Sequence, residues 1–137
     1  MSPLLLDTHT AIWLVHNEPI ARAAEQALNA VHETGGTLLV SPITAYEVGL
    51  LVSLRRIDLL ATPQRWFALL LSIPNVQLAE LSPDILIASS FLPATPPRNP
   101  ADRILIATAR ELAATLVTRD REMLAYGERG NVSVLAC

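Results

Sequence analysis

The sequence contains no lysine, and all ten of its basic residues are arginine. This absence argues against two kinds of catalytic site. A Walker-A nucleotide site requires a lysine on the phosphates, and Schiff-base chemistry requires a lysine amine. Phosphoryl-acceptor folds that carry an aspartate after their first strand usually rely on a lysine as well, so the sequence also disfavours that class.

Cysteine and long hydrophobic runs are equally scarce. The single cysteine is Cys137, so no intrachain disulfide is expected and nothing indicates an oxidising compartment. The longest apolar stretches, residues 66–73 and 85–92, are far shorter than the roughly 18 residues of a membrane span. The apolar run at 4–6 has no basic segment before it and stops at Asp7, so we expect no signal peptide and a cytoplasmic protein without membrane contact.

Positive charge in excess is also missing, because 13 acidic residues outnumber the basic ones and the net charge is −3. The protein therefore does not bind nucleic acid through bulk positive charge. With 137 residues, of which 51% are hydrophobic and only five are glycine, the chain is neither disordered nor of low complexity. We expect one domain over residues 1–137.

Short, uniformly apolar segments alternate with helical segments along the chain. Strands are expected at 3–6, 38–40, 76–81, 115–118 and 132–135. Helices are expected through 12–15 (capped by Thr8 or Thr10) and at 20–31, 43–54, 64–72, 84–91, 101–113 and 121–126. Uniformly apolar strands are typical of a parallel sheet that is covered on both faces. We predict an α/β fold, a three-layer α/β/α sandwich around a mostly parallel sheet of about five strands.

Four acidic residues fall where such a sheet binds ligands, at the carboxyl ends of its strands. Asp7 and Asp120 follow the first and fourth strands. Glu47 lies one turn into the helix after the second strand, and Asp102 lies in the first turn of the helix after the proline-rich loop 93–100. Each acid alone is also explained as a turn former or a helix-dipole partner. Together they would repel one another, so their convergence predicts a bound divalent cation.

Two of these acids, Glu47 and Asp102, share a helix face with apolar residues. The apolar neighbours are Ile43, Leu50, Leu51 and Leu54 for Glu47, and Leu105, Ile106, Ala109 and Ala113 for Asp102. An acid on a buried stripe costs several kcal/mol unless an arginine, a proton or a metal ion compensates it.

The ligand chemistry favours Mg²⁺, with Mn²⁺ as the alternative, because all of the candidate donors are oxygens. Zinc is disfavoured, since His9, His16 and His32 show no ligand spacing. Carboxylate-held Mg²⁺ polarises a phosphoryl oxygen and generates hydroxide. The serines have no histidine–acid pair near them in the sequence, so these residues point to hydrolysis of a phosphodiester.

The segments that carry the four acids read LLLDTH (4–9), SPITAYEV (41–48), NPADRILIA (99–107) and LVTRD (116–120). In their order and spacing they resemble those of PIN-domain proteins, and in particular the VapC-type toxins of bacterial toxin–antitoxin pairs. The resemblance covers nearly the whole chain. It implies a metal-dependent endoribonuclease that forms a homodimer and is inhibited by a cognate antitoxin inserted near the active site.

By the same resemblance, Asp7, Glu47, Asp102 and Asp120 form the acidic quartet. Asp7 and Asp102 are the firmest Mg²⁺ ligands, while Glu47 and Asp120 complete the metal's shell or orient the attacking water. Thr118 supplies a hydroxyl next to the quartet.

One departure from the family pattern lies just before Asp102. Close relatives often have an aspartate where this chain has Asn99, and an aromatic residue where it has Ala101. Asparagine can still cap the helix, so the fold should survive. The change puts in doubt any accessory role of that carboxylate, such as binding a second metal.

Two further questions remain open at this point. Arg98, Arg103, Arg119 and Arg121 lie near the acids and suit contacts to RNA phosphates, but Arg103 and Arg119 could equally neutralise Asp102 and Asp120. The apolar segments 50–60 and 66–71 suit either a groove for a partner's amphipathic helix or a dimer interface.

The alternatives to a toxin are a PIN-fold nuclease of RNA processing without an antitoxin and an inactive PIN-fold binding module.

Overall fold

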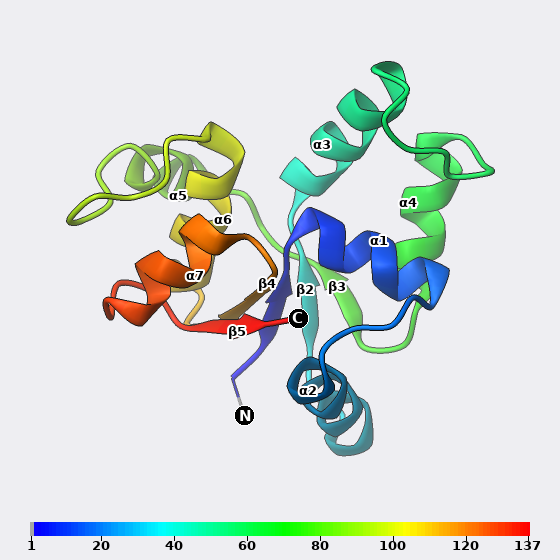
Figure 1. Ribbon diagram of the computed structural model, residues 1–137, viewed down its shortest axis with the longest axis horizontal. Coiled ribbons are helices and arrows are strands. Elements are labelled where there is room, and N and C mark those ends of the chain that lie inside the picture. The colour runs from blue at the N-terminus through cyan, green and yellow to red at the C-terminus, as the bar shows by residue number, and fades with distance from the viewer. Residues whose placement is uncertain (1) are drawn as a thin grey trace.

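A computed structural model describes residues 2–137, and the five strands of this part of the chain form one sheet (Figure 1). The strands are β1 (Leu4–Leu6), β2 (Leu38–Val40), β3 (Val76–Leu78), β4 (Thr115–Thr118) and β5 (Val134–Ala136). Their order is β3-β2-β1-β4-β5, and every neighbouring pair is parallel. The predicted parallel sheet is confirmed.

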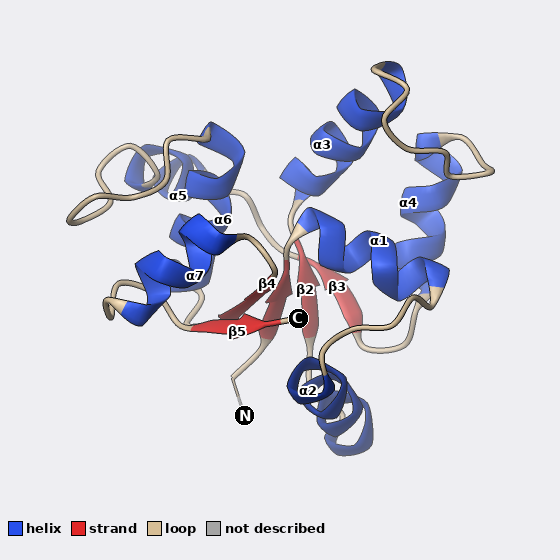
Figure 2. Cartoon of the chain, viewed as in Figure 1, coloured by secondary structure: helices blue, strands red, loops and turns tan. Residues whose placement is uncertain are grey.

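Helices cover both faces of the sheet, as Figure 2 shows. They are α1 (Thr8–His16), α2 (Arg22–Thr34), α3 (Pro42–Ser53), α4 (Pro63–Ser72), α5 (Pro83–Ala88), α6 (Pro100–Glu111) and α7 (Arg121–Glu128). Helices α1 to α4 contribute to one core cluster and α6 and α7 to the other, while α5 packs on α6. The predicted three-layer sandwich is confirmed. None of the helices in residues 2–137 has the length and apolar character needed to cross a lipid bilayer.

Strand β1 shows why the strands are apolar at every position. Leu4 and Leu6 belong to the core cluster beneath α1 to α4, whereas Leu5 belongs to the cluster beneath α6 and α7. Successive side chains of a strand point to opposite faces. Since both faces of this sheet are covered, each leucine is buried.

Capping residues fix where the helices begin. Ser41, Thr62, Ser82 and Asn99 each accept backbone N–H groups of the helix that follows, and each is succeeded by a proline in the first turn. The prediction that Thr8 or Thr10 caps α1 is wrong. Asp7 is the N-cap, and its carboxylate accepts a hydrogen bond from the backbone N–H of Thr8 at 2.7 Å.

Several predicted boundaries are displaced by a few residues. The strand β3 ends at Leu78 rather than at 81, α5 ends at Ala88 rather than at 91, and α2 begins at Arg22 rather than at 20. The helix α6 ends at Glu111 rather than at 113, because Ala113 adopts a φ of 51° that a helix cannot continue through.

Helix α7 and strand β5 approach each other closely at Gly127. A Cβ atom there would lie 2.7 Å from Cγ1 of Val134 and closer still to its Cγ2. Because a β-branched side chain in a strand has little freedom to move away, we expect Gly127→Ala to lower the free energy of unfolding by about 1–3 kcal/mol, measured by urea unfolding. Gly49→Ala in α3 meets no atom within 4 Å and should raise stability by up to about 1 kcal/mol. Equal effects of the two substitutions would contradict this account.

Candidate active site

All four acids predicted from the sequence line one cavity of about 450 Å³. It lies beyond the carboxyl ends of β1 and β4, where the strand order reverses: the chain builds β2 and β3 on one side of β1 and then places β4 and β5 on the other. Open parallel sheets bind ligands at such a switch point. The residues around the cavity are Asp7, Thr8, His9, Trp13, Glu47, Asn99, Asp102, Arg119 and Asp120.

Asp7 is the most deeply placed of the four acids, with only 6% of its surface exposed. Its backbone N–H donates to the carbonyl oxygen of Val117 at 3.0 Å, which fixes it against β4. Its Oδ1 accepts from the N–H of Thr8, and its Oδ2 accepts from the hydroxyl of Thr118 at 2.7 Å. Burial raises the pKa of Asp7, although these two hydrogen bonds oppose the increase.

Thr118 connects Asp7 to Asp120. Its Oγ1 donates to Asp7 and at the same time accepts from the backbone N–H of Asp120 at 3.0 Å. Asp120 is the N-cap of α7, since its Oδ1 accepts from the N–H of Met123 at 2.9 Å. The fully buried hydroxyl of Thr118 thus lies beside the quartet, between two of its members.

Glu47 is connected to the first turn of α1 by the hydroxyl group of Thr8. Its Oε1 accepts from Oγ1 of Thr8 at 2.5 Å, and the same Thr8 oxygen lies 3.1 Å from Oγ1 of Thr44. Because Thr8 has one hydroxyl hydrogen and gives it to Glu47, Thr44 is the donor to Thr8. Burial raises the pKa of Glu47, and the nearby carboxylate of Asp7 raises it further.

The expected buried stripe beside Glu47 is formed only in part, because Ile43 and Leu51 pack against the core but the other two members do not. Leu50 and Leu54, expected on a buried stripe with Glu47, are 44% and 55% exposed. Glu47 itself lines the cavity, and its burial there raises its pKa.

Asp102 has the largest displacement of pKa, from 3.8 to about 7. Burial is the main cause, and the carboxylates of Asp7, Asp120, Glu47 and Glu122 each raise the pKa further. The group is therefore easily protonated near neutral pH when no cation is present.

Asn99 orders the turn of chain that carries Asp102. Its Oδ1 accepts from the backbone N–H of Ala101 at 2.9 Å and from that of Asp102 at 3.2 Å. The prediction that asparagine keeps the capping function at this position is confirmed.

The hypothesis that Arg103 neutralises Asp102 is wrong. The Nε of Arg103 donates to the carbonyl oxygen of Pro97 at 2.7 Å, which fastens the proline-rich loop to α6. The charged groups that shift the pKa of Asp102 are all carboxylates. The negative charge of the cavity is therefore not compensated at Asp102 by its neighbouring arginine.

Sequence reasoning left several residues of this site without a role. Thr8 and Thr44 position Glu47, and His9 and Trp13 line the cavity, with their rings 6.2 Å apart on one face of α1. His9 and Trp13 are four residues apart in α1, the helix that Asp7 caps, so they share one helix face. This spacing is the signal that could have placed both residues at the site. His9 faces the acids and lowers the pKa of both Asp7 and Glu47.

The donor set fits a hard divalent cation that is held by few protein ligands. Within residues 2–137, no three histidine, cysteine, aspartate or glutamate side chains form a ready-made metal centre. Mg²⁺ commonly binds through one or two carboxylates and keeps several of its waters. The cavity is lined by four carboxylates, which offer such oxygen donors. Three of these carboxylates have raised pKa values, so a bound cation would stabilise their ionised forms.

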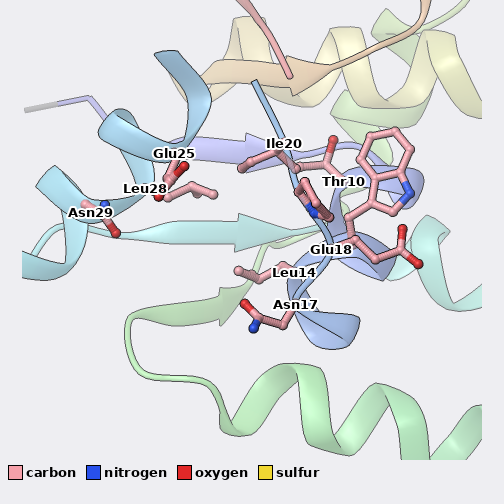
Figure 3. Close-up of a pocket in the computed structure, with 10 residues that line it drawn as sticks. Thr10, Leu14, Asn17, Glu18, Ile20, Glu25, Leu28 and Asn29 are labelled. Carbon is pink, nitrogen blue, oxygen red and sulfur yellow. The ribbon is translucent and has the colours of Figure 1, made fainter. Parts of the chain in front are cut away.

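A second cavity, of about 330 Å³, shares Trp13 with the first and lies between α1 and α2 (Figure 3). Its lining mixes apolar side chains with Glu18 and Glu25, which lie on opposite sides of the space. Because its acids do not converge, the cavity around Asp7 is the stronger candidate for catalysis.

A family model, a protein of similar sequence and several solved structures each match most of this chain. The family model of the PIN domain matches residues 4–128. The chain is 31% identical over 135 residues to Ribonuclease VapC22 of Mycobacterium tuberculosis, with 98% of this chain and 99% of that protein covered. Among solved structures, a toxin–antitoxin complex from Klebsiella pneumoniae aligns with 27% identity and a TM-score of 0.63, over 96% of this chain and 95% of that one. VapBC2 from Rickettsia felis, bound to a DNA fragment from their promoter, has the same fold, with 16% identity, a TM-score of 0.69 and 98% of both chains covered.

Proposed function

The chain belongs to the PIN-domain family, and we propose on this basis that it is a metal-dependent endoribonuclease acting as the toxin of a toxin–antitoxin pair. The observation that carries the proposal is the convergence of Asp7, Glu47, Asp102 and Asp120 on one cavity at the switch point of the sheet. The match to a ribonuclease of nearly equal length supports the activity, and the toxin–antitoxin complex from Klebsiella pneumoniae supports the biological role.

In this proposal Asp7 and Asp102 are the principal ligands of Mg²⁺, with Mn²⁺ as the alternative, and Glu47 and Asp120 complete the site. The cation, when bound, would supply charge neutralisation and polarisation of a phosphoryl oxygen.

The side chains then have separate tasks. Thr118 holds Oδ2 of Asp7 in place, and Thr8 holds Oε1 of Glu47. The other oxygen of Glu47, Oε2, has no hydrogen-bond partner in residues 2–137 and is open to a water molecule. As that water attacks the phosphorus, one of its protons passes to Oε2 of Glu47 and the bond from phosphorus to the leaving oxygen breaks. The leaving oxygen keeps the bonding electron pair and takes up a proton from solvent water.

Exposed apolar side chains support the proposed protein partners, a cognate antitoxin and a second copy of the chain. Tyr46, Leu50 and Leu54 follow one another along α3 and its C-terminal cap, and Ile87 and Phe91 are exposed in and after α5. Large apolar side chains gathered on a surface mark sites of protein association. Tyr46 and Leu50 also line a cavity that includes Glu47, so a partner bound there would cover that acid. We place the protein, with its RNA substrate, in the cytoplasm.

Expression in a bacterial host tests this function. Induction of the wild-type chain should arrest growth and produce discrete new 5′ ends in the sequenced total RNA, whereas Asp7→Asn should do neither. Co-expression of a small DNA-binding protein encoded next to this gene should relieve the arrest. Arrest by both chains would favour an inactive binding module, and cleavage that no neighbouring protein relieves would favour a nuclease of RNA processing.

A further inference from the structure

One arginine, Arg119, is found among the residues that line the acidic cavity in the described part of the chain. Its guanidinium carbon lies 3.9 Å from the centroid of the indole ring of Trp13. Its Nε donates to the backbone carbonyl oxygen of Cys137 at 3.0 Å. The guanidinium is therefore fixed both by stacking on a ring and by a hydrogen bond from one of its edges.

The remaining donors of Arg119 are not used in the described part of the chain. Neither of its Nη nitrogens has a hydrogen-bond partner in residues 2–137. The charged groups that shift the pKa values of Asp7, Glu47 and Asp102 do not include Arg119. Arg119 also forms no ion pair with Asp120 or with another acid in residues 2–137, so the geometry does not support the alternative that it neutralises Asp120. Arg119 is exposed and lines the cavity, and its terminal nitrogens are available to a ligand as far as residues 2–137 are concerned.

We propose that Arg119 binds a phosphate of the RNA substrate through its two Nη nitrogens, beside the acids. The guanidinium fork matches two oxygens of a phosphodiester. Because Trp13 and Cys137 already hold the side chain, little of its conformational freedom remains to be lost when the substrate binds. The inference rests on the proposed ribonuclease function and names a substrate contact for it.

The need for such a group follows from charge. RNA is a polyanion, the chain has a net charge of −3, and four carboxylates line the cavity. A cation at the acids would reverse the local sign at one point only. A fixed arginine on the cavity wall supplies a second positive group, at which a neighbouring phosphate can be held in register with the scissile bond.

The chain offers a matched control in Arg129. Its guanidinium also lies over an aromatic ring, 5.8 Å from the centroid of Tyr126, and its Nη2 donates to the carbonyl oxygen of Thr95 at 3.1 Å. It does not line the acidic cavity. Arg129→Gln therefore removes an arginine held in a similar way, but away from the proposed substrate contact.

The test measures binding of a short, fluorescent, single-stranded RNA of mixed sequence by anisotropy, with Mg²⁺ present. All chains carry Asp102→Asn, so that cleavage does not interfere. We expect Arg119→Gln to weaken binding about tenfold. Since one phosphate contact is lost, the slope of log affinity against log salt should fall by about 0.7. Arg119→Lys should keep most of the slope but not the affinity, because lysine keeps the charge and lacks the fork.

A purely structural role for Arg119 predicts a different pattern. If Arg119 only fastens the chain near Cys137, Arg119→Gln would lower the unfolding temperature but leave the salt slope equal to that of Arg129→Gln, and the inference would fail. New 5′ ends from the wild-type chain, together with unchanged RNA binding by Arg119→Gln, would overturn the inference and leave the nuclease intact. Absence of both cleavage and RNA binding by chains with Arg119 intact would overturn both.

Discussion

Asp102→Asn is expected to abolish RNA cleavage by the purified chain, lowering the rate at least about 10³-fold. The proposed cation contributes several kcal/mol to stabilisation of the transition state, and each 1.36 kcal/mol corresponds to a factor of ten in rate. Asparagine has nearly the shape of aspartate but gives up the charge that a divalent cation requires. The measurement is the initial rate of RNA cleavage with saturating Mg²⁺, compared with the wild-type chain under the same conditions.

The same substitution should make the metal-free chain more stable at pH 8. The pKa of Asp102 is about 7 in the folded chain and near 3.8 in the unfolded chain, so folding increases its affinity for a proton. The ionised Asp102 carboxylate therefore lowers the free energy of unfolding. This loss is absent below about pH 4, grows between pH 4 and 7, and is complete above pH 7. Because the group is partly exposed to solvent, we expect Asp102→Asn to gain only about 1–2 kcal/mol at pH 8, and nothing at pH 4.

Urea unfolding in EDTA at the two pH values measures this gain. Asp84→Asn, at an exposed acid in the first turn of α5, is the control and should give no gain at pH 8. A variant that loses cleavage and also loses stability would indicate that Asp102 supports the fold. A variant that gains stability but still cleaves RNA would remove Asp102 from the catalytic residues.

The sequence was sufficient to predict the architecture because its local signals agree with one another. Apolar triplets such as Leu4–Leu6 have no exposed face, which is consistent only with a covered sheet, and serine or threonine followed by proline fixes the beginnings of α3, α4 and α5. The ends of elements depend on weaker preferences. The φ of 51° at Ala113 follows from how α6 joins β4, and alanine itself gives no indication of it.

The candidate site was predictable in its acids but not in what surrounds them. Asp7 and Asp120 could be located because they follow strands, and parallel strands end at one edge. Contacts between distant segments could not be located in this way. The stacking of Arg119 on Trp13 joins α1 to the end of β4, and it depends on the register in which Leu6 pairs with Val117. Such a register is set by the whole sheet and not by the residues in contact.

The fully buried hydroxyl of Thr118 gives the last prediction. It donates to Asp7 and accepts from the backbone N–H of Asp120, so Thr118→Val would leave Oδ2 of Asp7 buried without this donor. Partners that orient a ligand typically account for 10–100-fold in metal affinity. We therefore expect Thr118→Val to weaken Mg²⁺ binding by about 10–100-fold, measured by calorimetric titration, while Thr118→Ser keeps near wild-type affinity.

Thr115→Val separates this effect from the general cost of replacing a threonine in β4. The hydroxyl of Thr115 lies 2.9 Å from that of Ser133, near the start of the strand and away from the cavity. Both variants exchange a hydroxyl for a methyl group in the same strand, but only one of them changes the surroundings of Asp7. Equal Mg²⁺ affinities for the two valine variants would mean that Thr118 serves the fold of β4 and not the acids. If only Thr118→Val loses Mg²⁺ affinity, and Thr118→Ser keeps it, then the position of Asp7 depends on the hydroxyl of Thr118 and therefore on β4.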